Sequence, residues 1–584
     1  MCGFVCVFQK KPVIANRDYF GAVTMMLKSI SHRGPDDQKI YSNPTQGLHI
    51  GFCRLSMVDV KMSMQPFWDT NERTAVIFNG EIYNYKSLRK EVGETTFGTL
   101  GEVELILQLY KMYGESFIEK LDGMFAICII DLLKGKVFAV RDKQGIKPLY
   151  YYEDEYAYIL ASELKAIRAV YPLEINPLAI EMYLSFRFIP APYSIYKKVS
   201  KLKAGEQITF YRDGEISKKC YVQYNTDFSQ RLFNADECRN VLKRNIDSTF
   251  DHGEVPVGLF LSGGIDSGII AAILKDRLKD KGSTYHIEYS YDRENNPEEN
   301  VFKLLVSQLG IDCGRIVFND AILNNIDRIV FALDEPFYST VSASTYSLSF
   351  HAKKTVKGVL TGDGSDELIY GYKYLRNAIN QKDPYEAYRN GIGWLKYIDY
   401  RSLLDSCSLH SDDISHFLYS DCCITGNILE TLRRVEVFKR LPDYHLMRVD
   451  RLTMAFGLEA RLPYLRSECV DMFLSINGDY FIQSEAKSPL KEAFSSSLPS
   501  VLLSSKKQPF YAPVKKWIEN TLQQDIQKTF CNKEVIKLLG LNFKAVNRML
   551  YMYDGSYAAV SNIWGMYLLL KWGQTELDRR QQSR

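Results

Sequence analysis

A cysteine at position 2 could act as a nucleophile whose base belongs to the same residue. The chain begins MCGFVCVF, and cysteine is small enough to permit removal of the initiator methionine. Removal would give Cys2 a free α-amine, whose intrinsic pKa of about 7.7–8.0 lies below the ~8.5 of its thiol. Such an amine is a suitable base for that thiol near neutral pH. The competing interpretation is an ordinary buried thiol at the start of a strand, a role that also suits Cys6.

A glycine-rich loop in the middle of the chain has the composition of a phosphate site. The run LFLSGGIDSG (259–268) places a Gly-Gly turn between an apolar strand and a helical pattern. Backbone N–H groups and a helix N-terminus then meet at one point, which attracts an anion. Ser262 and Ser267 can donate to phosphate oxygens, whereas Asp266 requires a hard cation such as Mg²⁺ between itself and the phosphate. Taken alone, such a turn is also a common helix start.

A second acidic loop follows a later apolar run. In VLTGDGSDE (359–367), Asp363, Asp366 and Glu367 lie just after the predicted strand. Ligand sites of open parallel sheets form at the carboxyl ends of their strands. We therefore expect this loop to lie beside the glycine-rich loop, although an isolated acidic turn can simply be solvated.

The first part of the chain predicts an α+β domain with antiparallel sheets. Short runs rich in Val, Ile, Phe and Tyr, separated by Gly, Asn and Asp, are typical of strands. The runs are residues 2–8, 48–60, 74–84, 124–142 and 148–162, with a final hairpin over 204–225. Apolar residues at helical spacing predict helices over 19–30 and 101–114. The domain is expected to end near residues 220–230.

Beyond that point the pattern changes to alternating strands and helices. Strands are predicted at 255–261, 284–290, 315–320 and 356–361, with helices at 268–280 and 298–310 between them. This alternation favours a parallel sheet covered by helices on both faces. From about Tyr372 onward the sequence is mostly helical.

Several longer strings resemble a known pair of domains. SHRGPDD (31–37), CRLSMVD (53–59), FNGEIYNY (78–85) and RDKQGIKPLYY (141–151) are similar to class II glutamine amidotransferase domains. Together with SGGIDS, TGDGSDE, RVDRLTMAFGLEARLPYL (448–465) and KSPLKEAF (487–494), they resemble the glutamine-hydrolysing asparagine synthetase family. The resemblance implies an N-terminal-nucleophile αββα sandwich over residues 2–220. It also implies an α/β parallel-sheet ATP-pyrophosphatase domain over residues 230–584, with a largely helical C-terminal part.

The resemblance also implies roles for residues of the first domain. Cys2 would attack the side-chain amide of glutamine, and Asn79 with Gly80 would form the oxyanion hole. Arg54 would bind the α-carboxylate of glutamine, and Glu81 with Glu102 its α-ammonium. The implied glutamine-binding set is Arg54, Leu55, Ser56, Met57, Val58, Asn79, Gly80, Glu81 and Glu102.

In the second domain the resemblance implies an ATP site with Mg²⁺. The implied ATP-binding residues are Phe260, Leu261, Ser262, Gly263, Gly264, Asp266, Ser267, Ile287, Thr361 and Gly362. Asp266 and Asp366 would be the metal ligands, and Lys487 would stabilise the leaving pyrophosphate. Glu459 and Asp363 correspond to acidic positions near the carboxylate that is amidated.

Four positions depart from the family pattern. Glu102 and Asp363 stand where the family more often has Asp and Glu, respectively. Cys53 replaces an arginine before Arg54, and Arg466 replaces an aspartate after RLPYL. The acceptor region 333–349 follows the aspartate-binding version only in part. Because these changes leave the reaction type intact, the identity of the acceptor carboxylate is the open question.

Aspartate is the leading acceptor, and the enzyme would convert it to asparagine through an adenylate. The close rival is the same chemistry on another carboxylate, such as a uronic acid of a surface polysaccharide. A β-lactam-forming synthetase would not need the nucleophile, so Cys2, Arg54, Asn79 and Gly80 argue against it. A non-enzymatic regulatory module is disfavoured by the intact phosphate loop.

Composition narrows the location and partners of the protein. With 584 residues and a net charge of +3, nothing favours nucleic acid or a membrane surface as a partner. The 12 cysteines have no metal-binding spacing, which is typical of reduced thiols. The absence of a signal peptide or long apolar segment predicts a cytoplasmic protein. The family resemblance also makes a homodimer an expectation.

Overall fold

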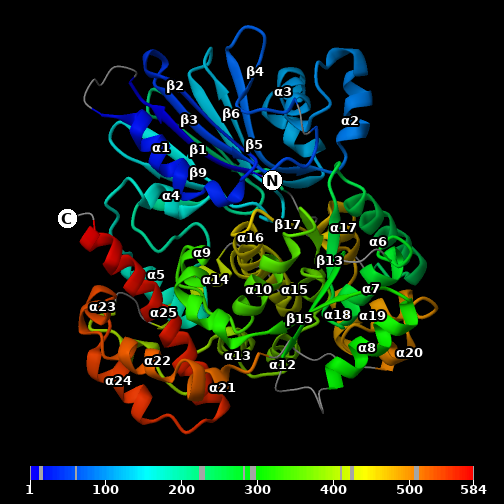
Figure 1. The fold of residues 1–584 in the computed structure, drawn as a ribbon, viewed down its shortest axis with the longest axis vertical. Coiled ribbons are helices and arrows are strands. Elements are labelled where there is room, and N and C mark those ends of the chain that lie inside the picture. Colours follow the sequence, from blue (N-terminus) through cyan, green and yellow to red (C-terminus); the bar gives the residue numbers. More distant parts are fainter. Residues whose placement is uncertain are drawn as a thin grey trace.

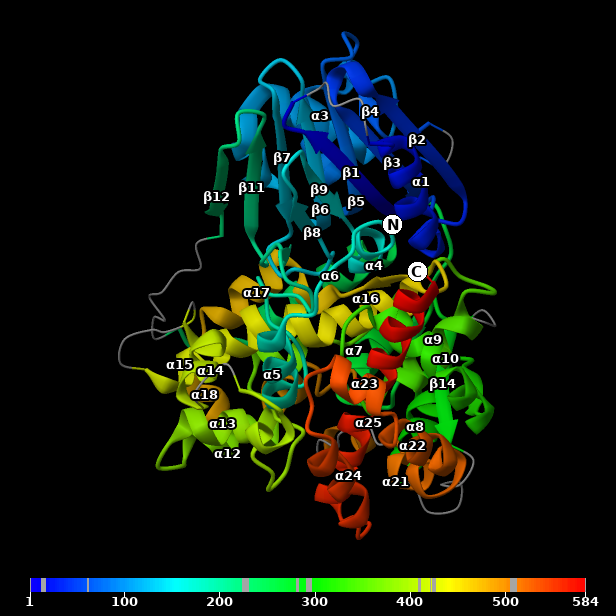
Figure 2. The ribbon, with the colours of Figure 1, turned by 90° about the vertical axis from the view of Figure 1, so that its left-hand side faces the viewer.

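The computed structural model divides the chain into a strand-rich part and a largely helical part (Figure 1). It describes residues 2–11, 17–59, 62–222, 231–279, 283–289, 297–407, 411–420, 422, 427–504 and 512–582. The predicted domain boundary near 220–230 falls largely on residues outside these ranges. The strand-rich part holds the N-terminal residues and the helical part holds the remainder of the chain, with the last helix returning toward the first part (Figure 2).

Two six-stranded antiparallel sheets form the first domain. The first sheet has the order β10(Val199–Lys201), β8(Tyr150–Glu153), β9(Ala157–Ala161), β1(Cys2–Gln9), β3(Leu48–Arg54), β2(Asp37–Asn43). The second has the order β12(Ile216–Cys220), β11(Glu206–Tyr211), β7(Lys136–Arg141), β6(Gly123–Asp131), β5(Thr74–Ile82), β4(Phe67–Trp68). The sheets stack face to face, with α1(Tyr19–Ser29) outside the first and α3(Glu102–Tyr113) outside the second (Figure 1). This confirms the predicted αββα sandwich.

Strand β1 is apolar up to Phe8, and both of its faces are buried. Side chains of a strand alternate between the two faces of its sheet. Phe4, Cys6 and Phe8 pack in the core between the sheets, whereas Val5 and Val7 pack toward α1. Cys6 therefore has the structural role that the sequence left open for it.

A five-stranded parallel sheet organises the second domain, as predicted. Its order is β15(Gly314–Phe318), β14(Thr284–Tyr289), β13(Val257–Phe260), β16(Gly358–Leu360), β17(Glu459–Arg461). Helices α7(Ile265–Leu274), α10(Ser342–Ala352) and α16(Met447–Met454) contact its strands, and α6(Ala235–Phe250) and α8(Pro297–Leu309) contact α7. Ile287 and Leu360 pack on one face of the sheet, and Tyr285 and Val359 belong to a second cluster on the other. The short edge strand β17 was not among the predicted strands.

The C-terminal part is largely helical, as expected. Its helices after Tyr372, besides α16, are α12(Lys373–Ile379), α13(Pro384–Ile392), α14(Ser411–Tyr419), α15(Ile428–Val435), α17(Ser467–Leu474), α18(Gly478–Gln483), α19(Ser488–Ala493), α20(Ser500–Ser504), α21(Val514–Lys516), α22(Gln523–Phe530), α23(Lys533–Leu538), α24(Phe543–Tyr551) and α25(Tyr557–Gln582). Earlier in the chain are α2(Tyr85–Val92), α4(Leu164–Arg168), α5(Pro177–Phe186), α9(Ile326–Leu333) and α11(Ser365–Leu368). Helices α15 and α16 are joined by a π-helical stretch, Glu436–Leu446, that contains Pro442.

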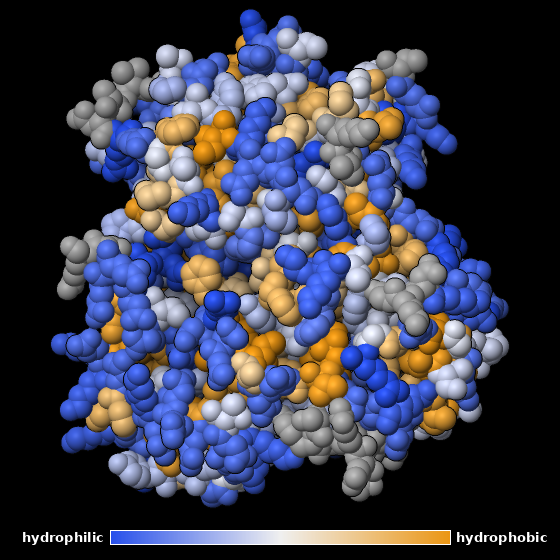
Figure 3. Space-filling view, viewed as in Figure 1, coloured by the Kyte–Doolittle hydropathy of each residue, from blue (hydrophilic) through white to orange (hydrophobic). Residues whose placement is uncertain are grey.

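The molecular surface narrows between the two domains, and polar side chains cover much of the face seen in Figure 3. Within the described ranges, none of the helices has the length and apolar character needed to cross a bilayer.

Candidate active sites

The first candidate site lies where the central strands of the two stacked sheets meet. Cys2 opens β1 and pairs with Arg54 of β3 in the sheet register. Its backbone N–H donates to Asn79 Oδ1 of β5, in the opposite sheet, over 3.0 Å. Cys2 is 7% exposed, and burial raises the pKa of its thiol.

Asn79 and Gly80 have the features expected of an oxyanion hole. Asn79 is fully buried, and its Nδ2 has no hydrogen-bond partner among the described residues. A buried amide donor without a partner costs free energy unless another group completes it. Gly80 has φ +154, and a Cβ there would meet Met124 O at 2.0 Å, so only glycine fits next to the neighbouring strand.

A pocket of about 40 Å³ opens beside Cys2. It is lined by Cys2, Arg54, Leu55, Met57, Val58, Ser63, Gln65, Phe78, Gly80, Glu81, Glu102 and Val103. Most of the predicted glutamine-binding residues are thus brought together. Ser56 and Asn79 are not among the lining residues. The Ser56 N–H donates to Asp36 Oδ2 over 2.9 Å, and Asn79 contacts Cys2 through its Oδ1. Ser63, Gln65, Phe78 and Val103 were not predicted.

A histidine from the second domain contacts the two carboxylates of this pocket. His252 Nε2 lies 2.7 Å from Glu81 Oε2 and 3.0 Å from Glu102 Oε1. Glu102, the first residue of α3, also accepts the N–H of Ile82 over 2.7 Å. Sequence reasoning missed His252 because it lies about 150 residues beyond Glu102, in a loop with no motif.

Burial and mutual contact set the charges of this group. Burial and the charge of Glu81 raise the pKa of Glu102 to about 7. Burial alone would lower the pKa of His252, but the carboxylates of Glu102 and Glu81 raise it to about 9. At neutral pH the imidazole is therefore a cation held between the two side chains.

The second candidate site is built from the loops after β13 and β16. The glycine-rich loop is held by its own hydroxyls, because Ser262 N–H donates to Ser267 Oγ over 3.2 Å and the two hydroxyls are 3.0 Å apart. Strands β13 and β16 are parallel neighbours, so the acidic loop lies beside the glycine-rich loop. A Cβ at Gly362 would meet Asp266 Cβ at 2.9 Å and Ser267 N at 3.0 Å. The close approach of the loops therefore requires glycine at this position.

The two predicted metal ligands converge on one cation. Lys487 Nζ lies 2.8 Å from Asp266 Oδ1 and 2.7 Å from Asp366 Oδ1. It also donates to Ser365 Oγ over 2.7 Å. Two carboxylates that share a single positive partner are the oxygen donor set that suits Mg²⁺, so the residues present fit that ion.

Around these loops lies a cavity of about 510 Å³, large enough for a nucleotide. Of the predicted residues, Phe260, Ser262, Gly263, Gly264, Asp266, Ser267, Thr361, Gly362, Asp363, Asp366 and Lys487 line it. Leu261 and Ile287 are buried behind the wall instead.

Several lining residues lie outside the predicted ATP and metal sites, among them Arg448, Glu367 and Tyr372. Arg448 Nη2 forms an ion pair with Asp363 Oδ1 over 3.0 Å. Burial and the charge of Asp366 raise the pKa of Glu367 to about 7, and Tyr372 donates to its Oε1 over 2.6 Å. The sequence could have indicated Glu367, since this residue directly follows Asp366 in the acidic string.

Glu459 lies away from this cavity, in β17 at the face toward the first domain. It is fully buried, and Arg461 Nε donates to its Oε1 over 2.6 Å. Arg461 Nη1 in turn donates to the backbone oxygen of His252 over 2.6 Å. Glu459 is therefore connected to His252 of the first candidate site through one arginine.

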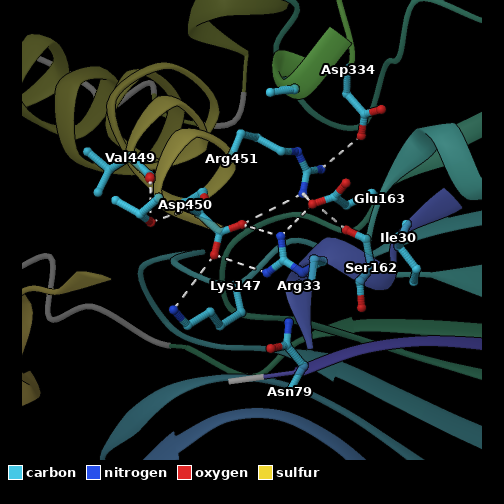
Figure 4. A network of polar contacts seen from close by, with 12 residues as sticks. Ile30, Arg33, Asn79, Lys147, Ser162, Glu163, Asp334, Val449, Asp450 and Arg451 are labelled. Carbon is cyan, nitrogen blue, oxygen red and sulfur yellow. Dashed lines mark hydrogen bonds and ion pairs between the residues drawn. The ribbon is translucent and has the colours of Figure 1, made fainter. Parts of the chain in front are cut away.

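A buried network of charges joins the two domains (Figure 4). Asp450 of α16 accepts a hydrogen bond from Arg33 Nη1 at its Oδ2 over 2.8 Å. Its Oδ1 lies 3.7 Å from Lys147 Nζ. Arg451 forms ion pairs with Glu163 over 3.2 Å and with Asp334 over 3.4 Å. Although burial opposes it, Arg33 and Lys147 hold the pKa of Asp450 below its usual value.

Helix α16 contacts both candidate sites. Val449 lines the nucleotide-sized cavity, and the next residue, Asp450, binds Arg33. Arg33 Nε donates to the backbone oxygen of Cys2 over 3.2 Å. The two cavities are thus linked by neighbouring residues of one helix.

The other two departures from the family pattern also have structural partners. Cys53 is fully buried, and its Sγ donates to Gly3 O and Ile30 O over 3.4 Å each. Arg466 forms an ion pair with Asp122 of the first domain over 2.5 Å and lies over the Tyr83 ring at 4.4 Å. Arg466 is therefore a contact between the domains.

The fold and the two sites define a class of protein, an amidotransferase domain joined to an ATP-using synthetase domain. A family model described as "Glutamine amidotransferase domain" matches residues 1–222, and one described as "Asparagine synthase" matches residues 237–574. The chain belongs to the glutamine-hydrolysing asparagine synthetase family, a family of glutamine-dependent ligases.

Curated relatives extend over most of the chain. Asparagine synthetase [glutamine-hydrolyzing] 1 of Bacillus subtilis (strain 168) is 28% identical, covering 99% of this chain and 98% of that protein. Asparagine synthetase [glutamine-hydrolyzing] 3 of Arabidopsis thaliana is 27% identical, covering 88% and 79%. A solved glutamine phosphoribosylpyrophosphate amidotransferase from B. subtilis aligns over 68% of this chain and 94% of that chain, at 14% identity and a TM-score of 0.29. A score this low is no evidence of a shared fold, and the fold described above rests on the strand order of the sheets.

Proposed function

We propose that this enzyme amidates aspartate with nitrogen from glutamine at the expense of ATP. The products would be asparagine, glutamate, AMP and pyrophosphate. One observation carries the proposal: α16 contacts the nucleotide-sized cavity through Val449 and the Cys2 site through Asp450 and Arg33. The names of the curated relatives support aspartate as the acceptor.

Glutamine hydrolysis would take place at Cys2. Once Met1 is removed, the nitrogen that donates to Asn79 Oδ1 becomes the α-amine that accepts the thiol proton. The thiolate would attack the glutamine amide carbon, and Asn79 Nδ2 with the Gly80 N–H would stabilise the oxyanion. Collapse would form the thioester and release ammonia, after which water would give glutamate. Arg54 would bind the α-carboxylate of glutamine.

Activation of the acceptor would take place at the two loops. The glycine-rich loop and its hydroxyls would bind the ATP phosphates, with Lys487 beside the leaving pyrophosphate. Asp266 and Asp366 would hold Mg²⁺, which when bound neutralises phosphate charge. A carboxylate oxygen of aspartate would attack the α-phosphorus and expel pyrophosphate. Ammonia would then attack the β-aspartyl-AMP and release AMP.

The identity of the acceptor carboxylate is the part of the proposal with a rival. Asp363, one of the departures from the family pattern, is held by Arg448 in the cavity wall. A different carboxylic acid, such as a uronic acid, is therefore the second candidate. A β-lactam-forming activity would make the Cys2 pocket and its Asn79 contact superfluous. The homodimer and the cytoplasmic location stay predictions.

The division of labour is tested by Cys2→Ala. This variant should lose glutamine-dependent AMP formation and keep ammonia-dependent AMP formation, because ammonia enters after the glutaminase step. Cys220→Ala, at an exposed cysteine, should retain both activities. Equal loss with both nitrogen sources would contradict the assignment of Cys2 to glutamine alone.

The acceptor is tested by AMP formation with glutamine and ATP across a panel of carboxylic acids. Stimulation by aspartate above the other acids supports the proposal. Stimulation by a uronic acid and none by aspartate would replace the acceptor and keep the chemistry.

A further inference from the structure

We propose that His252, a residue of the synthetase domain, occupies the subsite in which the α-ammonium group of glutamine binds. Glutamine must then displace the imidazole from two carboxylates before it reaches Cys2. This inference rests on the glutaminase function proposed above and adds a specificity role for a residue of the other domain.

The contacts of His252 are those of an amine ligand. Its Nε2 lies within 3.0 Å of both Glu81 and Glu102, the two side chains proposed to bind the glutamine α-ammonium. The rings of Tyr83 and Tyr85 meet the imidazole edge-on, with centroids at 5.1 Å and 5.4 Å. Two carboxylates and two aromatic rings thus surround the imidazole.

The pocket cannot accept both cations in this arrangement. The cavity beside Cys2 measures about 40 Å³, which holds roughly three water molecules and fewer atoms than glutamine has. Two positive groups side by side in a buried site would also repel one another. Binding of glutamine therefore requires that the imidazole moves.

Movement of His252 would be passed on within the second domain toward the nucleotide-sized cavity. Its backbone oxygen accepts Arg461 Nη1 over 2.6 Å, and Arg461 binds Glu459 over 2.6 Å. The next residues of the same loop hold the glutamine-binding segment, because Glu254 N–H donates to Met57 O over 2.9 Å. Strand β17, which carries Glu459 and Arg461, pairs with β16, whose loop lines the nucleotide-sized cavity.

The test is the dissociation constant of glutamine, measured by calorimetry in a Cys2→Ala background that does not hydrolyse it. Cys2→Ala/His252→Asn should bind glutamine about tenfold more tightly than Cys2→Ala, within the range of typical coupling between sites. His252→Gln in the same background gives a second neutral variant in case the first does not fold. His49→Asn serves as a matched control, since His49 is a buried histidine of the first domain that is bonded to Ser42 outside the pocket.

A glutamine analogue without the α-amine, 5-amino-5-oxopentanoate, separates this role from a general effect on the pocket. The analogue has no cation to place, so its dissociation constant should change less than about twofold on the same substitution. An equal gain for glutamine and the analogue would overturn the inference, because it would indicate a widened pocket. Weaker or unchanged glutamine binding in both His252 variants would also overturn it, and would indicate that His252 only supports the carboxylates.

Failure of the proposed function gives a different result. If Cys2→Ala protein binds no glutamine with His252 either present or replaced, the glutaminase proposal fails and this inference fails with it. If Cys2→Ala binds glutamine and the His252 variants bind it no better, the inference alone is overturned.

Discussion

At the scale of single residues, the proposed mechanism gives Asn79 two roles, one toward the nucleophile and one toward the charge that develops during its attack. Its Oδ1 accepts the backbone N–H of Cys2, which fixes the amide plane. The same plane leaves Nδ2 buried without a partner among the described residues. One side chain thus orients the nitrogen proposed as the base and supplies a donor for the oxyanion.

Asn79→Ala should lower kcat for glutamine hydrolysis by about 10²–10³-fold, the usual cost of one oxyanion-hole donor. The KM for glutamine should change little, since the donor acts in the transition state. Steady-state release of ammonia from glutamine measures both constants. Asn43→Ala is the control, because Asn43 caps a short turn far from Cys2 in the same domain. A fall in kcat smaller than about tenfold would contradict the role of Asn79.

The sequence indicated which residues belong to the first site but not what lies against them. Cys2, Arg54, Asn79 and Glu102 fall in recognisable strings. In the structure Cys2, Arg54 and Glu102 line one small pocket, and Asn79 is bonded to Cys2 behind it. His252 could not be predicted, because a single histidine in a loop has no periodicity and no spacing to Glu102. Its contact depends on how the two domains meet.

At the scale of elements, the second site depends on two loops that touch. Gly362→Ala would place a Cβ at 2.9 Å from Asp266 Cβ and 3.0 Å from Ser267 N. Ser267 N is a backbone atom, so it can move only if the loop moves. The loops must separate, so pyrophosphate release with ammonia as the nitrogen source should fall at least about tenfold. Release of pyrophosphate under saturating ATP is the measurement.

Gly314→Ala is the matched control in the same sheet. Its added Cβ would lie 3.4 Å from its nearest neighbour, Thr284 O, which is ordinary contact. Equal pyrophosphate release by the two variants would contradict the claim that the two loops must touch at Gly362.

Long elements were predictable from the sequence and short ones were not. Strand β1 and helices α1 and α3 have clear periodicity or continuous apolar character over eight to twelve residues. Strand β17 has three residues, and no pattern distinguishes it from the helices around it. Pro442 normally ends a helix, yet here the helix continues through it with π-helical geometry.

At the scale of the whole molecule, the buried charges between the domains fix how the two sites face each other. Asp450→Ala would leave Lys147 and Arg33 buried without its carboxylate. The expected loss is about 3 kcal/mol of unfolding free energy, the lower end of the usual range, because Arg33 keeps Glu163. The urea midpoint of the first unfolding transition should therefore fall.

An exposed pair provides the control for this interface. Asp276→Ala removes the partner of Lys279, 2.6 Å away on the surface, and should not change the midpoint measurably because solvent screens such pairs. A midpoint for Asp450→Ala equal to that of Asp276→Ala would show that the network contributes no stability.

The order of the two domains and their separate chemistries were predictable, because each motif lies within one domain. The interface was not predictable, since Arg33, Lys147, Asp450 and Arg466 resemble ordinary charged residues until the domains pack together. The ion pair of Arg466 with Asp122 gives that departure from the family pattern a place in the interface.

The central claim, transfer of nitrogen from glutamine to aspartate in one enzyme, is tested most directly with isotope. The protein is incubated with glutamine labelled with ¹⁵N in its side-chain amide, ATP, Mg²⁺ and aspartate, and the products are analysed by mass spectrometry. The account predicts asparagine labelled in its side-chain amide, formed together with one AMP per molecule. Labelled ammonia without labelled asparagine, and no stimulation of AMP formation by aspartate, would contradict it.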